Sequence, residues 1–259
     1  SDADGDAAMV ERFCGDVLAE RAPKLAICWQ CSPDKAGHGA PLLGPEHLAA
    51  MAAADRHVGQ VVATVERLRA SGDEVLLLVG SDHGMESIGP RVHVAERLVQ
   101  AGLKDGLESG EVAVACQGTC AVVYVAPGAE GRIDGLRDYL SNAEWVGNVL
   151  EGEALDALGA RREYGLTFAV DMAHLAKDNG HGVAGQRYEA IDGAEGDAAG
   201  GFAQHGGLGP RETAPFLVVD DGTGKGRERT AASSLPNIAP TILGYLGVAA
   251  PDLPALVLA

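Results

Sequence analysis

An almost uninterrupted apolar stretch at residues 74–80, EVLLLVG, follows a long stretch at 45–70 whose apolar residues recur every three or four positions. The spacing at 45–70 is typical of an amphipathic helix, which Ser71 and Gly72 would end. The apolar stretch at 74–80 is typical of a strand covered by helices on both faces. A helix followed at once by such a strand predicts a βαβ arrangement, and therefore an α/β fold.

The same alternation continues through most of the sequence. The apolar spacing and the turn residues predict further helices at 9–21, 92–102, 133–142 and 234–247, and further strands at 24–30, 111–115, 120–126 and 214–221. We therefore expect a mostly parallel central sheet with helices on both faces. Residues 144–203 are rich in glycine and charge, and we expect loops and a short irregular excursion there.

Length and composition limit the class of protein. With 259 residues and 46% hydrophobic content, the chain can form one large domain or at most two small ones, and we expect a single domain over residues 1–259. No apolar run approaches the roughly 18 residues of a membrane span. The start, SDADGDAA, is acidic where a signal peptide would be basic, so a soluble and, by default, cytoplasmic chain is expected.

The charge balance bears on partners. Twenty basic and 37 acidic residues give a net charge of -17, which repels nucleic-acid backbones and anionic membranes. A nucleic-acid scaffold is therefore not expected. An acidic protein can still bind a phosphorylated small molecule where bound divalent cations reverse the local field.

Five cysteines cannot all pair within one chain, and their spacing does not match a secreted disulfide framework. Cys28 and Cys31 form a CxxC, which could be a redox pair or half of a zinc site with Cys116 and Cys120. We favour the simpler interpretation, in which these cysteines are small apolar residues near a buried strand.

Three segments concentrate metal-ligand residue types beside predicted strands, where open α/β sheets bind their ligands. In PDKAGHGAP, Asp34 and His38 lie four apart, so one helical turn brings them to the same face. In GSDHGM, Asp82 and His83 leave the apolar strand at a glycine-flanked loop. In QHGGLGPRETAPF, His205 precedes two glycines. Two carboxylates and three imidazoles suit zinc, and are acceptable to manganese or iron.

In this order, these residues resemble the alkaline phosphatase superfamily, most closely its nucleotide pyrophosphatase/phosphodiesterase branch. The resemblance extends over nearly the whole chain, including the closing IAPTILGYLG. It implies an alkaline-phosphatase-like fold and two divalent cations, with Asp34, His38 and His205 on one and Asp82 and His83 on the other.

The family completes the second site with a further aspartate and a threonine or serine nucleophile. Neither the strand that carries this aspartate nor the nucleophile helix has a counterpart here, so no catalytic residue is identified and the chain is expected to be inactive alone. Ser32 and Ser81 lie beside ligand positions, but neither matches a nucleophile at a helix N-terminus.

The resemblance implies a two-metal hydrolase of phosphodiesters or phosphomonoesters with a small phosphorylated substrate. Two alternatives stay open on the same fold. One is an enzyme of the phosphonoacetate hydrolase, sulfatase or phosphoglycerate mutase type, and the other is a superfamily member that binds a metal or an anion without catalysis. Four residues match no family ligand, and we expect them to be solvated loop residues: Asp171, His174, Asp178 and His181. Lys35 and Arg211 lie close in sequence to ligand positions and could contact a substrate phosphate, but we favour a surface charge for both.

Overall fold

The computed structural model describes residues 3–192, 202–224 and 233–249. It divides into two compact units, each described below by itself. The first unit comprises Ser1–Ser32, Ala52–Asp82 and Phe216–Ala259, and the second comprises Pro33–Met51 and His83–Pro215. The described chain contains both helices and strands, as expected of an α/β protein, although they do not alternate strictly. Among the described helices, none combines the length and the apolar character needed to cross a bilayer.

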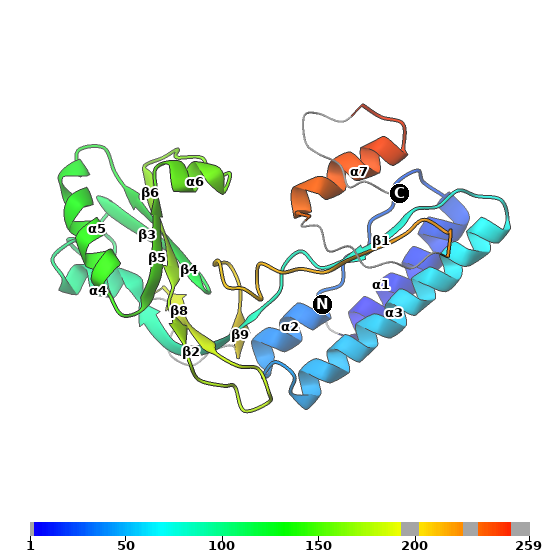
Figure 1. Ribbon diagram of the computed structural model, residues 1–259, viewed down its shortest axis with the longest axis horizontal. Coiled ribbons are helices and arrows are strands. Elements are labelled where there is room, and N and C mark those ends of the chain that lie inside the picture. Colours follow the sequence, from blue (N-terminus) through cyan, green and yellow to red (C-terminus); the bar gives the residue numbers. More distant parts are fainter. Residues whose placement is uncertain (1–2, 193–201, 225–232, 250–259) are drawn as a thin grey trace. The chain divides into compact units, whose positions relative to one another are not determined.

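The larger sheet of the second unit is antiparallel throughout and has the strand order β3-β4-β6-β5. Its strands are β3 (Val112–Gln117), β4 (Cys120–Val125), β6 (Leu166–Met172) and β5 (Val146–Glu151). Two helices cover one face of this sheet, α4 (Val94–Gln100) and α5 (Ile133–Asn142), and the short α6 (Glu153–Ala157) follows β5 (Figure 1).

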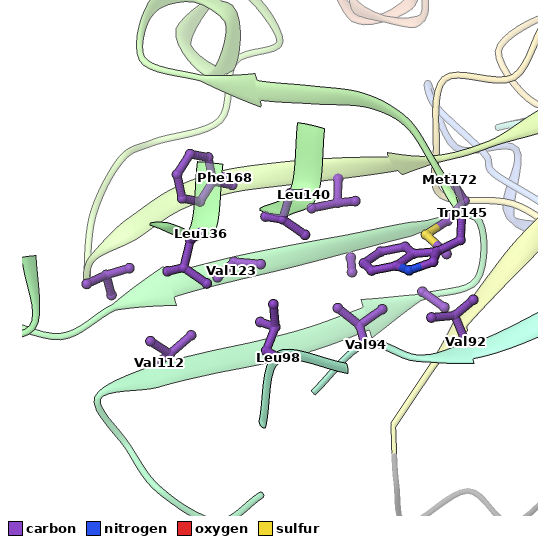
Figure 2. Close-up of a cluster of buried hydrophobic side chains, with 14 residues drawn as sticks. Val92, Val94, Leu98, Val112, Val123, Leu136, Leu140, Trp145, Phe168 and Met172 are labelled. Atoms are coloured by element: carbon purple, nitrogen blue, oxygen red, sulfur yellow. The ribbon is translucent and has the colours of Figure 1, made fainter. Parts of the chain in front are cut away.

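The core of the second unit lies between this sheet and its two helices (Figure 2). Leu136 and Leu140 of α5 are four residues apart, so both point from the helix into the core, where each is fully buried. Val123 and Phe168 face them from neighbouring strands and are also fully buried. Alternate residues of β4 and β6 are buried, which is the period expected when one face of a sheet is covered.

The smaller sheet of the second unit has the strand order β7-β8-β2-β9. Its strands are β7 (His174–Leu175), β8 (Gln186–Ile191), β2 (Glu86–His93) and β9 (Ala203–Gln204). Strands β2 and β8 are parallel, while β9 pairs antiparallel with the start of β2, with Ser87 opposite Ala203. This pairing brings the segment that begins at His205 beside the segment that ends at Met85.

The first unit combines helices with one two-stranded antiparallel sheet. Its elements are α1 (Ala3–Arg12), the π-helical η1 (Phe13–Arg21), α3 (Pro45–Ala70) from Ala52 onward, β1 (Leu77–Gly80), β10 (Leu217–Asp220), η3 (Leu235–Asn237) and α7 (Ile238–Tyr245). Arg69 near the end of α3 donates hydrogen bonds to the side chain and the carbonyl of Asp220, which ties the helix to β10.

Three sequence predictions need correction. A mostly parallel sheet was predicted, but one described sheet is mixed and the other two are antiparallel, and among the described strands only β2 and β8 pair in parallel. An apolar run signals burial and carries no information on strand direction. No described strand pairs with 24–30, where Leu25 and Ile27 are exposed; an apolar stretch becomes a strand only when a neighbour satisfies its backbone groups. The described part of 144–203 contains β5 to β8, whose short alternating patterns are flanked by glycines.

Candidate functional site

The first candidate ligands lie on α2 (Ser32–Gly39), whose residues from Pro33 onward belong to the second unit. Asp34 and His38 are one helical turn apart, and Nε2 of His38 lies 3.3 Å from Oδ1 of Asp34. The helix packs closely on the segment after His83, because a Cβ atom added at Gly37 would lie 2.2 Å from the sulfur of Met85. A glycine at this position therefore permits the approach.

Strand β9 brings His205 to the same place. The amide of Phe202 donates to the carbonyl of His38 at 3.0 Å, and Nδ1 of His38 lies 2.9 Å from the carbonyl oxygen of Ala203. These two bonds join the end of α2 to β9. His205 follows directly, and its Nε2 lies 3.5 Å from Oδ1 of Asp34.

His83 completes the cluster. Its ring stacks on the ring of His205, with 3.6 Å between centroids. Asp34, His83 and His205 each offer a ligand atom, and these atoms all lie within 4.8 Å of one another. The loop that carries His83 is fixed by a bond from the Gly84 amide to the carbonyl of Glu212 at 2.9 Å.

The hydrogen bonds of two histidines determine which ring nitrogen faces the cluster. Nδ1 of His38 lies beside the Ala203 carbonyl, and Nδ1 of His83 lies 2.9 Å from the carbonyl of Gly84. A carbonyl oxygen only accepts hydrogen bonds, so each Nδ1 carries the proton and, in the neutral ring, each Nε2 keeps its lone pair. Carbonyl partners of this kind orient metal-binding histidines.

The donor set fits a divalent cation. Oδ1 of Asp34 is buried and accepts no hydrogen bond, although Nε2 of His38 and Nε2 of His205 lie within 3.5 Å of it. A buried carboxylate oxygen without a hydrogen bond is costly unless a cation compensates it. One carboxylate surrounded by imidazoles suits zinc, with manganese or iron as further options. Asp82 ends the Ala52–Asp82 segment of the first unit, and its role as a ligand stays a prediction.

A buried ionic network lies under the loop that follows His205, and the sequence analysis did not identify it. Arg187 of β8 has only 2% of its side chain exposed and donates to Glu212 at 2.8 Å and to Asp171 at 2.6 Å. Glu86, also fully buried, accepts from the amide and the guanidinium of Arg211. The signal available in the sequence was Asp171, a carboxylate inside the otherwise apolar stretch that forms β6.

This network corrects the expectation for Asp171 and shows the partner of Arg211. Asp171 belongs to β6 and pairs with Arg187, so it is not a solvated loop residue. Arg211 pairs with buried Glu86 at 3.0 Å, although 40% of its own side chain is exposed. His174 lies exposed on β7, and Asp178 accepts a bond from the amide of Gly185.

The cysteines are free thiols. Burial, together with the nearby carboxylates of Asp171 and Glu212, raises the pKa of Cys120 to about 11. Burial also raises the pKa of Cys28. Because a metal ligand or a nucleophile must be the thiolate, a raised pKa disfavours both roles for these two residues at neutral pH.

Comparison with protein families finds a match over residues 2–163 to the family described as type I phosphodiesterase / nucleotide pyrophosphatase. The matched region includes Asp34, His38, Asp82 and His83. No curated protein sequence matches the chain.

A longer protein of solved structure shows the same fold. Phosphonoacetate hydrolase from Sinorhizobium meliloti 1021, in complexes with phosphonoformate and with phosphonoacetate, aligns with a TM-score of 0.63 at 16% identity. The alignment covers 90% of this chain and 53% of that enzyme, so the chain spans about half the length of this relative. Murine ectonucleotide pyrophosphatase / phosphodiesterase 5 aligns with a TM-score of 0.48 at 18% identity, covering 83% of this chain and 51% of its own.

Proposed function

The chain belongs to the type I phosphodiesterase / nucleotide pyrophosphatase family, and from this premise we propose that it supplies a divalent-metal site of a phosphoester hydrolase. The alignment with phosphonoacetate hydrolase supports the alkaline-phosphatase-like α/β fold. The observation that carries the proposal is the group formed by Asp34, His83 and His205, with ligand atoms within 4.8 Å of one another.

The proposed ligand sets follow the family pattern. Asp34, His38 and His205 would hold one cation, and Asp82 and His83 would contribute to a second. Zinc is the expected metal, because borderline imidazole ligands outnumber carboxylates. A bound cation would polarise a phosphoryl oxygen and neutralise its charge. In a chain of net charge -17, that compensation is what permits a small phosphorylated ligand to bind.

The chain's own residues would keep the ligands oriented. The carbonyls of Ala203 and Gly84 hold the rings of His38 and His83 through their Nδ1 protons. The resemblance assigns the nucleophile to none of these residues, so we expect this chain to bind a phosphorylated ligand without cleaving it.

Metal titration of the purified chain tests the proposal. Zinc binding followed by calorimetry after chelator treatment is expected to show high affinity in the wild type and a loss of more than about tenfold in Asp34→Asn, since even outer partners of metal ligands contribute about 10–100-fold. Asp138→Asn, on the exposed side of α5, is the matched control and should bind zinc as the wild type does. Wild-type binding that is undetectable, or insensitive to Asp34→Asn, contradicts the proposal.

The ligand class is tested in the zinc-loaded chain. Inorganic phosphate, phosphonoformate, a nucleoside monophosphate and sulfate are titrated separately, with and without zinc. Phosphorus oxyanions are expected to bind only when zinc is present, and EDTA should abolish the signal. Stronger binding of phosphonoformate than of the phosphates would favour the phosphonate alternative, while preferential sulfate binding would favour the sulfatase alternative.

A further inference from the structure

The turn between β3 and β4 approaches the backbone of His205 very closely. Gly118 in this turn has φ +58°, and a Cβ atom there would lie 2.5 Å from the carbonyl oxygen of His205. A bond from the Ala190 amide to the Gly118 carbonyl at 2.7 Å pins the turn to β8. The turn is therefore held in place by β8 and packs directly against the backbone of His205.

The next residue, Thr119, contacts the backbone on both sides of Gly206. Its amide donates to the carbonyl of His205 at 3.4 Å, and its Oγ1 accepts from the amide of Gly207 at 2.8 Å. Thr119 is fully buried, so water does not replace these partners. One threonine thus fixes the backbone immediately after a proposed metal ligand.

Thr119 is itself held by the ionic network. Its hydroxyl donates to Oε2 of Glu212 at 2.5 Å, and this carboxylate also accepts from the amides of Gly207 and Gly209. Arg187 holds the same carboxylate at 2.8 Å. Hydrogen bonds to charged groups are the stronger kind, so this arrangement restricts the loop.

Close packing makes the loop depend on these contacts. Gly206 has φ +117°, and a Cβ there would lie 2.4 Å from the Gln117 carbonyl oxygen. A Cβ at Gly207 would lie 2.6 Å from both the Thr119 carbonyl oxygen and a carboxylate oxygen of Asp171. The two glycines after His205 therefore permit the loop to lie directly on the turn and the network.

We propose that Thr119 is a positioning residue, which holds the imidazole of His205 in place for a metal ion through the backbone on either side of Gly206. The inference rests on the proposed metal site and goes beyond it, because Thr119 is neither a predicted ligand nor part of the family pattern. Partners that orient metal ligands typically contribute about 10–100-fold to metal affinity.

Three variants separate positioning from general stability. Thr119→Val keeps the shape and removes the hydroxyl, and Thr119→Ser restores the hydroxyl on a smaller side chain. Thr64→Val is the matched control, because Thr64 is also buried and donates its hydroxyl to the carbonyl of Gln60 in α3. Each variant is titrated with cobalt(II), and the visible absorption of the bound ion reports affinity and ligand geometry, while circular dichroism and thermal melting report folding.

We expect cobalt affinity to fall by about tenfold in Thr119→Val with an altered spectrum, to recover in Thr119→Ser, and to be unchanged in Thr64→Val. Wild-type affinity and spectrum in a folded Thr119→Val overturn the inference, as does an equal loss in Thr64→Val. If the wild type binds no cobalt, or Asp34→Asn binds as well as the wild type, it is the proposed metal site that fails.

Should Thr119→Val not fold, Asp171→Asn replaces it as the test. Asp171 accepts from the amide of Leu208 at 2.7 Å and holds the same loop without touching His205. A reduced cobalt affinity in folded Asp171→Asn supports a loop that positions the ligand, and unchanged affinity contradicts it.

Discussion

Nε2 of His38 lies 3.3 Å from Oδ1 of Asp34, one turn earlier in the same helix. The other nitrogen of this ring is bound to the carbonyl of Ala203, which stands 165 positions away in the sequence. A local helical spacing and a long-range hydrogen bond therefore act together to point one imidazole lone pair at one buried carboxylate oxygen.

His38→Gln is expected to lower zinc affinity by more than about tenfold, because it removes a lone pair from the ligand set and the bond to the Ala203 carbonyl. Calorimetric titration measures the change. His174→Gln, at an exposed position of β7, is the control and should leave affinity unaltered. Equal affinities for the two variants would show that His38 does not bind the metal.

Arg187→Met is expected to destabilise the protein by about 3–5 kcal/mol, because it leaves the carboxylates of Glu212 and Asp171 buried without their counter-ion. Urea denaturation measures the free energy of unfolding. Arg162→Met removes an exposed pair with Asp156, half of each side chain being accessible, and should cost at most about 1 kcal/mol. Similar losses in the two variants would contradict the buried network.

Because of Cys120, the free energy of unfolding is expected to fall between pH 9 and pH 11. The pKa of this thiol is raised from 9.0 to about 11, first by burial, so the unfolded chain ionises at a lower pH than the folded one. Ionisation of the unfolded state favours unfolding, so the free energy of unfolding falls by about 2 kcal/mol by pH 11. Cys120→Ala lacks this effect, so wild-type stability relative to the variant should decline over that range in chemical denaturation; a pH-independent difference would refute the expectation.

Gly84→Ala is expected to destabilise the protein by about 1–3 kcal/mol, because its Cβ would lie 2.1 Å from the carbonyl oxygen of Arg211, a backbone atom that cannot rotate away. The backbone shift that relieves this clash should also weaken zinc binding, because His83 is the adjacent residue. Gly131→Ala is the control, with no atom within 4 Å of the added Cβ. Thermal melting of both variants, with zinc titration, checks the prediction; equal melting temperatures would contradict it.

Elements with a local cause were predictable from the sequence. The helix α3 spans Pro45–Ala70 and α5 spans Ile133–Asn142, both as predicted, because apolar spacing and end residues act within a few turns. Strands β1, β3, β4 and β10 were also identified, with small differences in their ends. Their partners and directions were not, since a strand pattern shows which face is buried and not which neighbour covers it.

The candidate site shows the same limit. Asp34, His38, Asp82, His83 and His205 were predicted as ligands from residue type and order, and this stays a prediction, although the structure brings Asp34, His38, His83 and His205 together. Thr119, Arg187 and Glu212 were not singled out in the sequence. In the sequence, a threonine in a turn between two strands looks like an ordinary turn residue. Its role depends on Gly207 and Glu212, 88 and 93 positions further along.

The sequence by itself determined where several helices and strands lie, the net negative charge and the residue types suited to a metal. Tertiary structure alone decided that the larger sheet is antiparallel, that Asp171 and Arg187 are buried together, and that His83 and His205 stack beside Asp34. Periodicity and capping act between neighbours in the chain, whereas these contacts depend on which distant segments pack together and so satisfy each other's charges and backbone groups.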